Sequence, residues 1–317
     1  IGVTGVQTCA LPISDLEIAA AHKPLRIAVL GLGLIGGSAS IVWRAAGHYL
    51  VGWSRRASTV DVAVTRGIVD EGAPSAAVAV ERANVVVLAP PVLAMRSLMV
   101  DISSHLAPGA VVTDVASTKE APERWAAQFL PASTHWVGAH PMAGKELSGI
   151  DHVDPMLFRG RTWVVVPPPG ANRKAVDVVA KLGGELGSRV VEMDAESHDD
   201  AVANVSHLPF MVSTALSQTV LGDDRFSAWS TVAATGLRDL TRLASGDVLM
   251  HRDICVTNRD RIADAMERFA TEFASLATQV RSLPNPDHAS GTTALTSMGD
   301  TFERAKVDRD EWLPHAR

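Results

Sequence analysis

The sequence predicts an α/β protein in which a parallel sheet flanked by helices is followed by a second, all-helical domain. Short valine-rich runs recur through the first half, and helix-compatible segments separate them. Strands without polar–apolar alternation are typical of parallel sheets that are covered on both faces. After residue 194 the composition changes, because residues 196–221 contain no glycine and residues 259–283 carry apolar side chains at helical spacing.

The strands of the first domain are expected at residues 26–30, 49–53, 84–88, 110–113, 136–139 and 162–166. A glycine-rich turn and a helix-like stretch separate the first two runs, and together they form a β-turn-α-β unit. One more helix–strand pair over residues 172–193 completes the domain. We therefore expect a first domain at residues 23–194, a helical domain at 195–284 and a polar, mobile tail at 285–317.

The composition excludes several classes of partner. The 317 residues carry a formal net charge of −6, and 47% of them are hydrophobic, which is enough for two cores. A mildly acidic chain has no general attraction for nucleic acid or anionic membranes, and no apolar run reaches the roughly 18 residues that span a bilayer. The two cysteines, Cys9 and Cys255, form no CxxC pair, so we expect no disulfide, no metal site and a reducing cytoplasm.

The first residues stand apart from this pattern. Residues 1–14 read IGVTGVQTCALPIS, have no clear period and lack the basic and apolar regions of a signal peptide. Part of this stretch, VTGVQTCALPI, resembles the translation of a common sequencing-adapter oligonucleotide. We therefore interpret residues 1–22 as an artefact, expect them to be poorly ordered and dispensable, and exclude them from the fold.

A glycine motif opens the first expected helix. Gly31, Gly33 and Gly36 form a GxGxxG pattern that follows a strand directly. In a Rossmann-type dinucleotide-binding domain the first glycine permits a tight turn, the second lets the backbone approach the pyrophosphate, and the third allows close packing of helix on strand. The start of the helix, at Leu34 and Ile35, then offers free N–H groups to the phosphates. A tight turn that binds no ligand is the alternative.

The end of the second expected strand indicates which nicotinamide cofactor is bound. An acidic residue there would bind the ribose 2′-hydroxyl of NAD. This chain has Ser54, Arg55 and Arg56 instead, and two guanidinium groups could hold a 2′-phosphate. The sequence therefore favours NADP, although a solvated arginine loop with NAD bound remains open.

Two later loops carry candidate chemistry. The segment GAHPMAGKE places His140 after an expected strand, and the segment DVASTK places Ser117 after another. Ligands of open α/β sheets bind at this carboxyl edge, and histidine is a natural proton acceptor near neutral pH. A polar stripe also follows the expected helix at residues 196–221. Its members are Asp200, Asn204, His207 and Met211.

Five motifs in this order resemble prephenate and arogenate dehydrogenases. They are GLGLIGGS at residues 31–38, DVASTK at 114–119, HPMAGKE at 140–146, SHLP at 206–209 and GLRDLTRLASGD at 236–247. The resemblance extends over residues 26–273. It implies oxidative decarboxylation of prephenate to 4-hydroxyphenylpyruvate in tyrosine biosynthesis, with hydride transfer to NADP or NAD.

The resemblance also implies roles for single residues. His140 matches the family's proton acceptor, Ser117 a serine that hydrogen-bonds the substrate hydroxyl and His140, and His207 a helix histidine lining the same pocket. Arg242 matches the arginine that binds the side-chain carboxylate of prephenate, and Glu146 an acidic residue at the pocket entrance. It further implies a homodimer formed through the helical domain. The long, largely apolar helix expected at residues 196–221 favours the same conclusion.

Three positions depart from the family pattern. Phe210 stands where a second histidine is frequent, His251 where a tryptophan is frequent, and Lys145 where a threonine is frequent. These departures bear on substrate preference more than on the type of reaction.

Other functions stay open at this point. Arogenate dehydrogenase differs only in an amino group on its substrate. A β-hydroxyacid dehydrogenase would need a lysine that residues 259–283 lack, and an NADP-sensing protein would not need His140, Ser117 and Arg242 together. We expect neither a chorismate mutase segment nor a regulatory domain beside the dehydrogenase part.

Overall fold

The computed structural model describes residues 24–145, 147–288 and 293–313. Its first part is built on a parallel six-stranded sheet with the strand order β3-β2-β1-β4-β5-β6. The strands are β1 (Arg26–Leu30), β2 (Tyr49–Trp53), β3 (Glu71–Gly72), β4 (Val85–Leu88), β5 (Val111–Asp114) and β6 (His135–Trp136). The interpretation of residues 1–22 lies outside the described residues.

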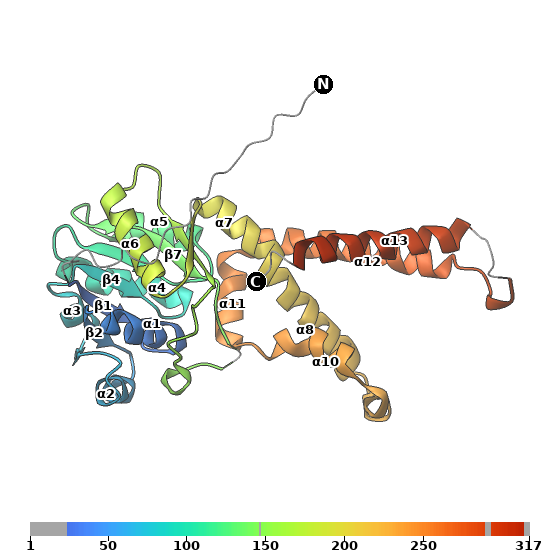
Figure 1. Cartoon of the computed structure of the whole chain (residues 1–317), viewed down its shortest axis with the longest axis horizontal. Coiled ribbons are helices and arrows are strands. Elements are labelled where there is room, and N and C mark those ends of the chain that lie inside the picture. The colour runs from blue at the N-terminus through green and yellow to red at the C-terminus, as the bar shows by residue number, and fades with distance from the viewer. Residues whose placement is uncertain (1–23, 146, 289–292, 314–317) are drawn as a thin grey trace, which may run out of the picture.

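Helices cover both faces of this sheet (Figure 1). They are α1 (Leu34–Ala45), α2 (Ala57–Thr65), α3 (Ala76–Val80), α4 (Val92–Ile102) and α5 (Glu120–Phe129). One buried apolar cluster joins the sheet to α1 and α6 (Arg173–Glu185), and a second joins it to α3, α4 and α5. This double coverage explains why the strands β1, β4 and β5 are buried on both sides.

A separate three-stranded sheet corrects part of the expected topology. Residues 136–139 were expected as one strand, but they are divided between β6 and β7 (Gly138–Pro141). Strand β7 pairs antiparallel with β8 (Thr162–Val166), which pairs parallel with β9 (Arg189–Glu192). A short apolar run does not reveal its strand direction or the sheet to which it belongs, so the sequence could not show this division.

The long helix expected at residues 196–221 is interrupted. Helix α7 (Ala195–Val202) begins at Asp194, whose carboxylate accepts a hydrogen bond from the Ser197 N–H at 2.8 Å. A π-helical turn over residues 203–207 leads from it into α8 (Leu208–Leu221). Pro209 has no N–H and its ring crowds the preceding turn, which disfavours a regular α-helical ladder at this point. The π turn carries His207.

The remaining helices form two arms. Helices α9 (Phe226–Trp229) and α10 (Thr235–Thr241) follow α8, and the turn η5 (Arg242–Ser245) folds back onto α8. Helix α11 (Val248–Thr257) leads into α12 (Arg259–Arg281), and α13 (Thr293–Trp312) runs beside α12 as a long arm (Figure 1). Within the polar tail expected at 285–317, residues 293–312 have regular structure. They form a helix that buries Met298 and bonds Thr301 to Gln279 at 3.2 Å.

The helical part has little core of its own in a single chain. Its buried apolar cluster contains three residues, Ala203, Ile254 and Ile262, and α8 buries only Ser213. Large apolar side chains are widely exposed instead, among them Val232, Val248 and Phe273. No helix in the described part of the chain is long and apolar enough to cross a membrane.

Candidate active site

The glycine loop has the geometry that a dinucleotide site requires. Gly31 has φ +120°, and a Cβ atom there would lie 2.5 Å from the Ala89 backbone. A Cβ atom at Gly36 would overlap the Gly31 carbonyl oxygen, so both positions exclude side chains. A Cβ atom at Gly33 would meet open space, which leaves room beside the backbone for a ligand. Gly31 and Gly36 are therefore required by the packing of the loop, and Gly33 by the space that a ligand needs.

Helix α1 presents its first N–H groups to that space. Gly33 is its N-cap and has no side chain to satisfy them, and α1 has no acidic residue in its first turn. The N–H groups at the start of a helix lack intrahelical acceptors and carry the positive end of the helix dipole. Leu34, Ile35 and Gly36 therefore fit the diphosphate of a dinucleotide.

The arginines after β2 lie beside this loop. The Gly31 N–H donates to the Trp53 carbonyl at 2.8 Å, which joins the glycine turn to the end of β2. Ser54 is half-buried, whereas Arg55 and Arg56 are exposed. In the described part of the chain, no hydrogen bond or ion pair engages either guanidinium group. Both are therefore available to an anionic ligand at the loop.

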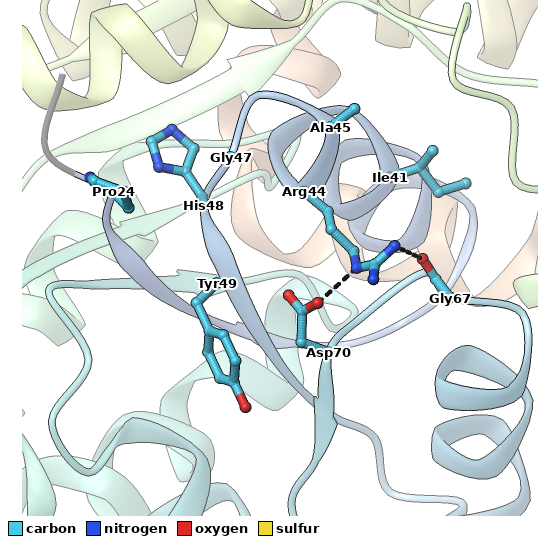
Figure 2. A pocket seen from close by; sticks show the side chains of 9 residues that line it. All are labelled: Pro24, Ile41, Arg44, Ala45, Gly47, His48, Tyr49, Gly67 and Asp70. Carbon is cyan, nitrogen blue, oxygen red and sulfur yellow. Dashed lines mark hydrogen bonds and ion pairs between the residues drawn. The ribbon is translucent and has the colours of Figure 1, made fainter. Parts of the chain in front are cut away.

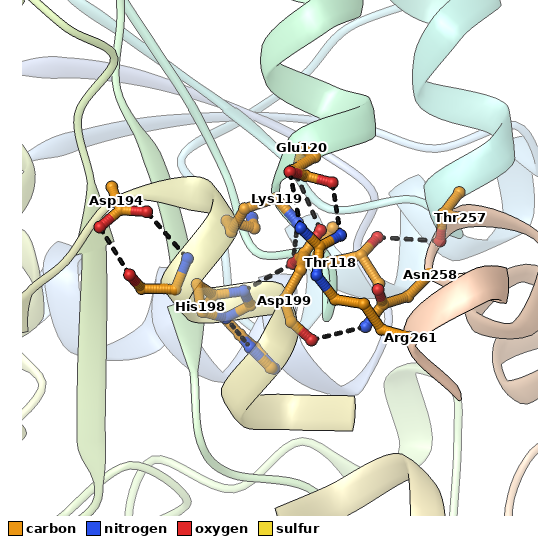
Figure 3. A network of polar contacts seen from close by, with 12 residues as sticks. Thr118, Lys119, Glu120, Asp194, His198, Asp199, Thr257, Asn258 and Arg261 are labelled. Carbon is orange, nitrogen blue, oxygen red and sulfur yellow. Dashed lines mark hydrogen bonds and ion pairs between the residues drawn. The ribbon is translucent and has the colours of Figure 1, made fainter. Parts of the chain in front are cut away.

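His140 lies inside β7 rather than in a loop after it. Its side chain is buried, and its Nδ1 atom lies 2.9 Å from Nε2 of His198. His198 in turn meets Asp199 Oδ1 through Nδ1 at 2.8 Å. Figure 3 shows Asp199 between the His198 ring and the loop that holds Lys119. His140 is therefore linked to a carboxylate through a second histidine.

Burial sets the charge state of His140. Removal from water lowers its pKa well below the usual 6.5, and the nearby His198, Lys119 and His207 lower it further. His140 is therefore neutral near pH 7 and can accept a proton from a ligand.

Asp114 and Lys119 anchor the strand that carries His140. Asp114 Oδ1 accepts a hydrogen bond from the Ala139 N–H at 3.0 Å, and Asp114 Oδ2 is paired with Lys119 Nζ. Lys119 Nζ also donates to the Ala139 carbonyl at 2.6 Å. Burial lowers the pKa of this lysine, while Asp114 opposes that effect. Both backbone groups of Ala139 are thus held one residue before His140.

The same loop joins the two domains. Asp199 accepts hydrogen bonds from the N–H groups of Lys119 at 2.7 Å and Glu120 at 3.0 Å, at the start of α5 (Figure 3). Arg261 of α12 forms a two-pronged ion pair with Glu120, at 2.7 and 3.0 Å. The carboxylate of the helical domain thus satisfies N–H groups of the first domain that would otherwise lack partners.

His207 is held in one orientation by Asn258. The Asn258 amide donates to the Asp199 carbonyl at 2.7 Å and lies 3.4 Å from His207 Nδ1. Burial lowers the pKa of His207 to about 4, so its ring is neutral near pH 7. Because Nδ1 faces an N–H donor, the ring proton belongs on Nε2. His207 is therefore a neutral hydrogen-bond donor.

The other expected site residues are placed less closely. Ser117 is half-buried in the loop before α5, and within the described residues no hydrogen bond joins its side chain to His140. Arg242 begins the turn η5, which packs against α8, and its side chain is exposed. Glu146 lies outside the described residues. Phe210 and His251, two departures from the family pattern, stack on each other with ring centroids 3.5 Å apart.

Sequence reasoning missed His198, Asp199, Asn258 and the pair of Asp114 with Lys119. The stripe that was singled out on the helix began one residue later, at Asp200, which is exposed. An available signal was the adjacent pair His198 and Asp199 in the first turns of the long expected helix, ahead of its apolar part. Lys119 and Asp114 belong to the DVASTK motif, in which only Ser117 had an expected role.

A shallow pocket at the opposite edge of the sheet is a poorer candidate (Figure 2). Its polar residues already have partners: Arg44 bonds Asp70 at 2.7 Å and the Gly67 carbonyl at 3.2 Å. His48 bonds the Leu25 N–H and Glu185. Leu30, Leu88 and Asp114 are in register, so the glycine loop and the groups around His140 share the other edge.

Comparison with protein families assigns this arrangement. Residues 40–192 match the model of the nucleotide-binding domain of prephenate dehydrogenase, and residues 194–290 match the model of its dimerization domain. The chain belongs to the prephenate dehydrogenase family. The family resemblance, the fold class and the class of nicotinamide-dependent oxidoreductases expected from the sequence are thereby confirmed.

Individual members of the prephenate dehydrogenase family agree with this assignment. Prephenate dehydrogenase of Bacillus subtilis (strain 168) is 31% identical over 258 residues, which cover 80% of this chain and 70% of that protein. The structure of prephenate dehydrogenase from A. aeolicus, in complex with hydroxyphenyl propionate and NAD+, superposes with a TM-score of 0.82 at 26% identity, over 92% of this chain and 99% of that one. The structure of Synechocystis arogenate dehydrogenase superposes with a TM-score of 0.77 at 29% identity, over 91% of this chain and 100% of that one.

Proposed function

We propose that the chain oxidises prephenate and decarboxylates it to 4-hydroxyphenylpyruvate, with His140 as the proton acceptor. The observation that carries this proposal is a buried, neutral histidine next to the carboxyl edge of the six-stranded sheet, which also holds the dinucleotide loop. A protein that only sensed the cofactor would need no such base. Membership of the prephenate dehydrogenase family supports the choice of substrate.

The reaction needs one base and accurate positioning. His140 accepts the proton of the 4-hydroxyl group as the hydride leaves C4, and the bound nicotinamide supplies the hydride acceptor. Loss of carbon dioxide from C1 then makes the ring aromatic. His207, as a neutral donor, is suited to hydrogen-bond the substrate without competing for the proton. The remaining demand on the protein is orientation of the substrate.

Three further residues are proposed to hold the substrate. Arg242 binds the side-chain carboxylate through its planar guanidinium group, and Ser117 bonds the ring hydroxyl. Glu146 is assigned to the entrance on the family resemblance alone. The half-buried position of Ser117 after β5 supports its role, and the packing of η5 against α8, which follows His207 directly, supports that of Arg242.

Arogenate is the second candidate substrate. The similarity to Synechocystis arogenate dehydrogenase favours it specifically, at 29% identity. Formation of reduced cofactor should be followed by absorbance with purified protein and either prephenate or arogenate. Turnover of prephenate at a higher kcat/KM supports the proposal, whereas preference for arogenate supports the second candidate. If neither prephenate nor arogenate is turned over, both candidate functions are contradicted.

The cofactor is proposed to be NADP. Two exposed guanidinium groups without carboxylate partners follow β2, where NAD-binding sites carry an acidic residue. The double variant Arg55→Ala/Arg56→Ala should raise KM for NADP by roughly tenfold or more, because each charge-assisted contact contributes about 1.5–3 kcal/mol. KM for NAD, measured on the same variant, should hardly change. Equal use of NAD and NADP by the unaltered protein would contradict this preference.

The functional unit is proposed to be a homodimer in the cytoplasm. The match of residues 194–290 to a dimerization domain supports the assembly, as do the exposed apolar side chains of the helical part. Helix α8 has apolar residues around most of its surface yet buries only Ser213 within one chain. A second copy is the simplest cover for such a surface.

A further inference from the structure

We propose that His198 and Asp199 are positioning residues, which hold the ring proton of His140 on Nδ1 and leave Nε2 bare for the substrate. This inference rests on the proposed role of His140 as the base. Its geometry is a chain of three groups: His140 Nδ1 lies 2.9 Å from His198 Nε2, and His198 Nδ1 lies 2.8 Å from Asp199 Oδ1. All three side chains are buried, and Asp199 is fully so.

The carboxylate decides the direction of both hydrogen bonds. An ionised carboxylate can only accept, so His198 donates through Nδ1 to Asp199. With its ring proton on Nδ1, His198 has a bare Nε2, which accepts a hydrogen bond from His140 Nδ1. His140 is left with its lone pair on Nε2, the atom on the far side of its ring. Without Asp199, either ring nitrogen of His140 could carry the proton.

Asp199 is itself held in place. Its two oxygens accept from the Lys119 and Glu120 N–H groups at 2.7 and 3.0 Å, and its own carbonyl accepts from Asn258. The start of α5 adds the positive end of a helix dipole, which favours the ionised carboxylate. The orientation of the acceptor at the end of the chain of rings is therefore fixed by the backbone.

The charged groups around His140 come from several elements. His198 and Asp199 lie on α7, His207 on the π turn, and Asp114 and Lys119 flank the loop after β5. Lys119 is paired with Asp114, whereas the Asp199 carboxylate is connected to the His140 ring through His198. That carboxylate stabilises the positive charge that His140 acquires when it takes the proton.

The protonation of His140 that catalysis needs is set only when the two domains dock. His140 belongs to the first domain, whereas His198 and Asp199 belong to the helical domain, 58 and 59 residues further along the chain. Either domain alone lacks part of the hydrogen-bonded chain of His140, His198 and Asp199. Contacts that dock the domains, such as that of Arg261 with Glu120, thereby also set the protonation of His140.

The first test reads the tautomer without any substrate. Full-length protein labelled with 15N-histidine is examined near pH 7 by long-range 15N–1H correlation, with His140→Gln and His198→Gln used to assign the two rings. We expect His140 to be protonated on Nδ1 alone, and Asp199→Asn to shift its population toward Nε2–H. A His140 ring protonated on Nε2 in the unaltered protein would overturn the inference.

The second test compares variants in turnover. Asp199→Asn and His198→Phe should lower kcat by at least about tenfold, and by no more than the 10²–10⁴-fold that a general base contributes, with KM for the cofactor little changed. His198→Gln should retain more activity than His198→Phe, because an amide oxygen can still accept from His140 Nδ1. Asp199→Asn should also move the acid limb of the pH profile to lower pH, because a nearby anion raises the pKa of a histidine.

His48 provides the matched control. It is a buried histidine paired with a carboxylate, Glu185 at 3.0 Å, but it lies at the opposite edge of the sheet. His48→Phe should lower stability without shifting the pH profile. Equal shifts for His48→Phe and Asp199→Asn would mean that Asp199 is merely structural. Absence of turnover with either substrate would contradict the proposed function, and the tautomer measurement would still decide this inference.

Discussion

His140 illustrates how a residue type and its surroundings share the definition of a site. The motif around it identified the residue from sequence, because histidine after a strand is a natural proton acceptor. Its burial in β7 and its contact with His198 are properties of the folded chain. They turn a histidine of ordinary pKa into a neutral base with one free nitrogen.

Replacing His140 should remove the base and little else. His140→Gln keeps a side chain of similar polarity, so we expect kcat to fall by roughly 10²–10⁴-fold while the dissociation constant of the cofactor stays within about twofold. A fall in kcat would support this expectation if the dissociation constant of the cofactor, measured by fluorescence titration, is unchanged. In the unaltered protein, kcat should persist well below pH 6.5, because the pKa of His140 is lowered. An acid limb at or above pH 6.5 would contradict it.

His207 makes the stability of the protein depend on pH. Its pKa is about 4 in the folded chain and near 6.5 when unfolded, so the unfolded chain binds the proton more tightly. The free energy of unfolding should therefore be unaffected by His207 above pH 6.5, and should fall as the pH drops from 6.5 to 4. The loss amounts to roughly 3 kcal/mol, at about 1.4 kcal/mol per pKa unit.

Urea unfolding at a series of pH values measures this loss. His207→Gln cannot titrate, so its stability should fall less steeply between pH 6.5 and 4 than that of the unaltered protein. Parallel curves for the two proteins would show that His207 is not the responsible group.

At the scale of elements, the glycine loop separates structural from ligand-binding constraints. Gly36 has no space for a Cβ atom because the Gly31 carbonyl occupies it. Gly33 has φ −77°, which any residue adopts, and open space around the missing Cβ. The two glycines of one motif are thus required for different reasons, one by the folded chain and the other by its ligand.

Alanine substitutions should distinguish these reasons. Gly36→Ala should lower the melting temperature, because helix α1 must move away from the β1 turn. Gly33→Ala should leave the melting temperature without cofactor unchanged and weaken cofactor binding by about tenfold or more, because the methyl group would occupy the space beside the pyrophosphate. Thermal unfolding with and without NADP checks both. A destabilised Gly33→Ala protein would contradict this division.

At the scale of the whole molecule, the helical domain is incomplete in one chain. Residues 195–288 expose more large apolar side chains than the longer first domain does, and they share a buried cluster of only three residues. An apolar surface of this kind is stabilised by burial against a partner. The helical arms extend away from the first domain in Figure 1, and their exposed apolar side chains could be covered by a second copy.

Sedimentation at micromolar concentration should show a dimer, and dilution should lower stability and activity together. Val248→Glu, at a side chain 83% exposed in one chain, should shift the equilibrium to monomers, because a buried unpaired carboxylate is strongly unfavourable. Val100→Glu on α4 of the first domain is the matched control and should remain dimeric. A fully active monomer would contradict the proposed assembly.

Local sequence determined much of this protein. Strands β1, β2 and β8, the glycine turn, the helical second domain and the importance of His140 follow from residue type, spacing and neighbouring elements. The tertiary structure decided the rest: the antiparallel pairing of β7, the π turn, helix α13, and the contacts of His140 with His198 and of Asp199 with α5. Periodicity records which face of a segment is buried, whereas hydrogen bonds between residues 58 positions apart arise only when the two domains dock.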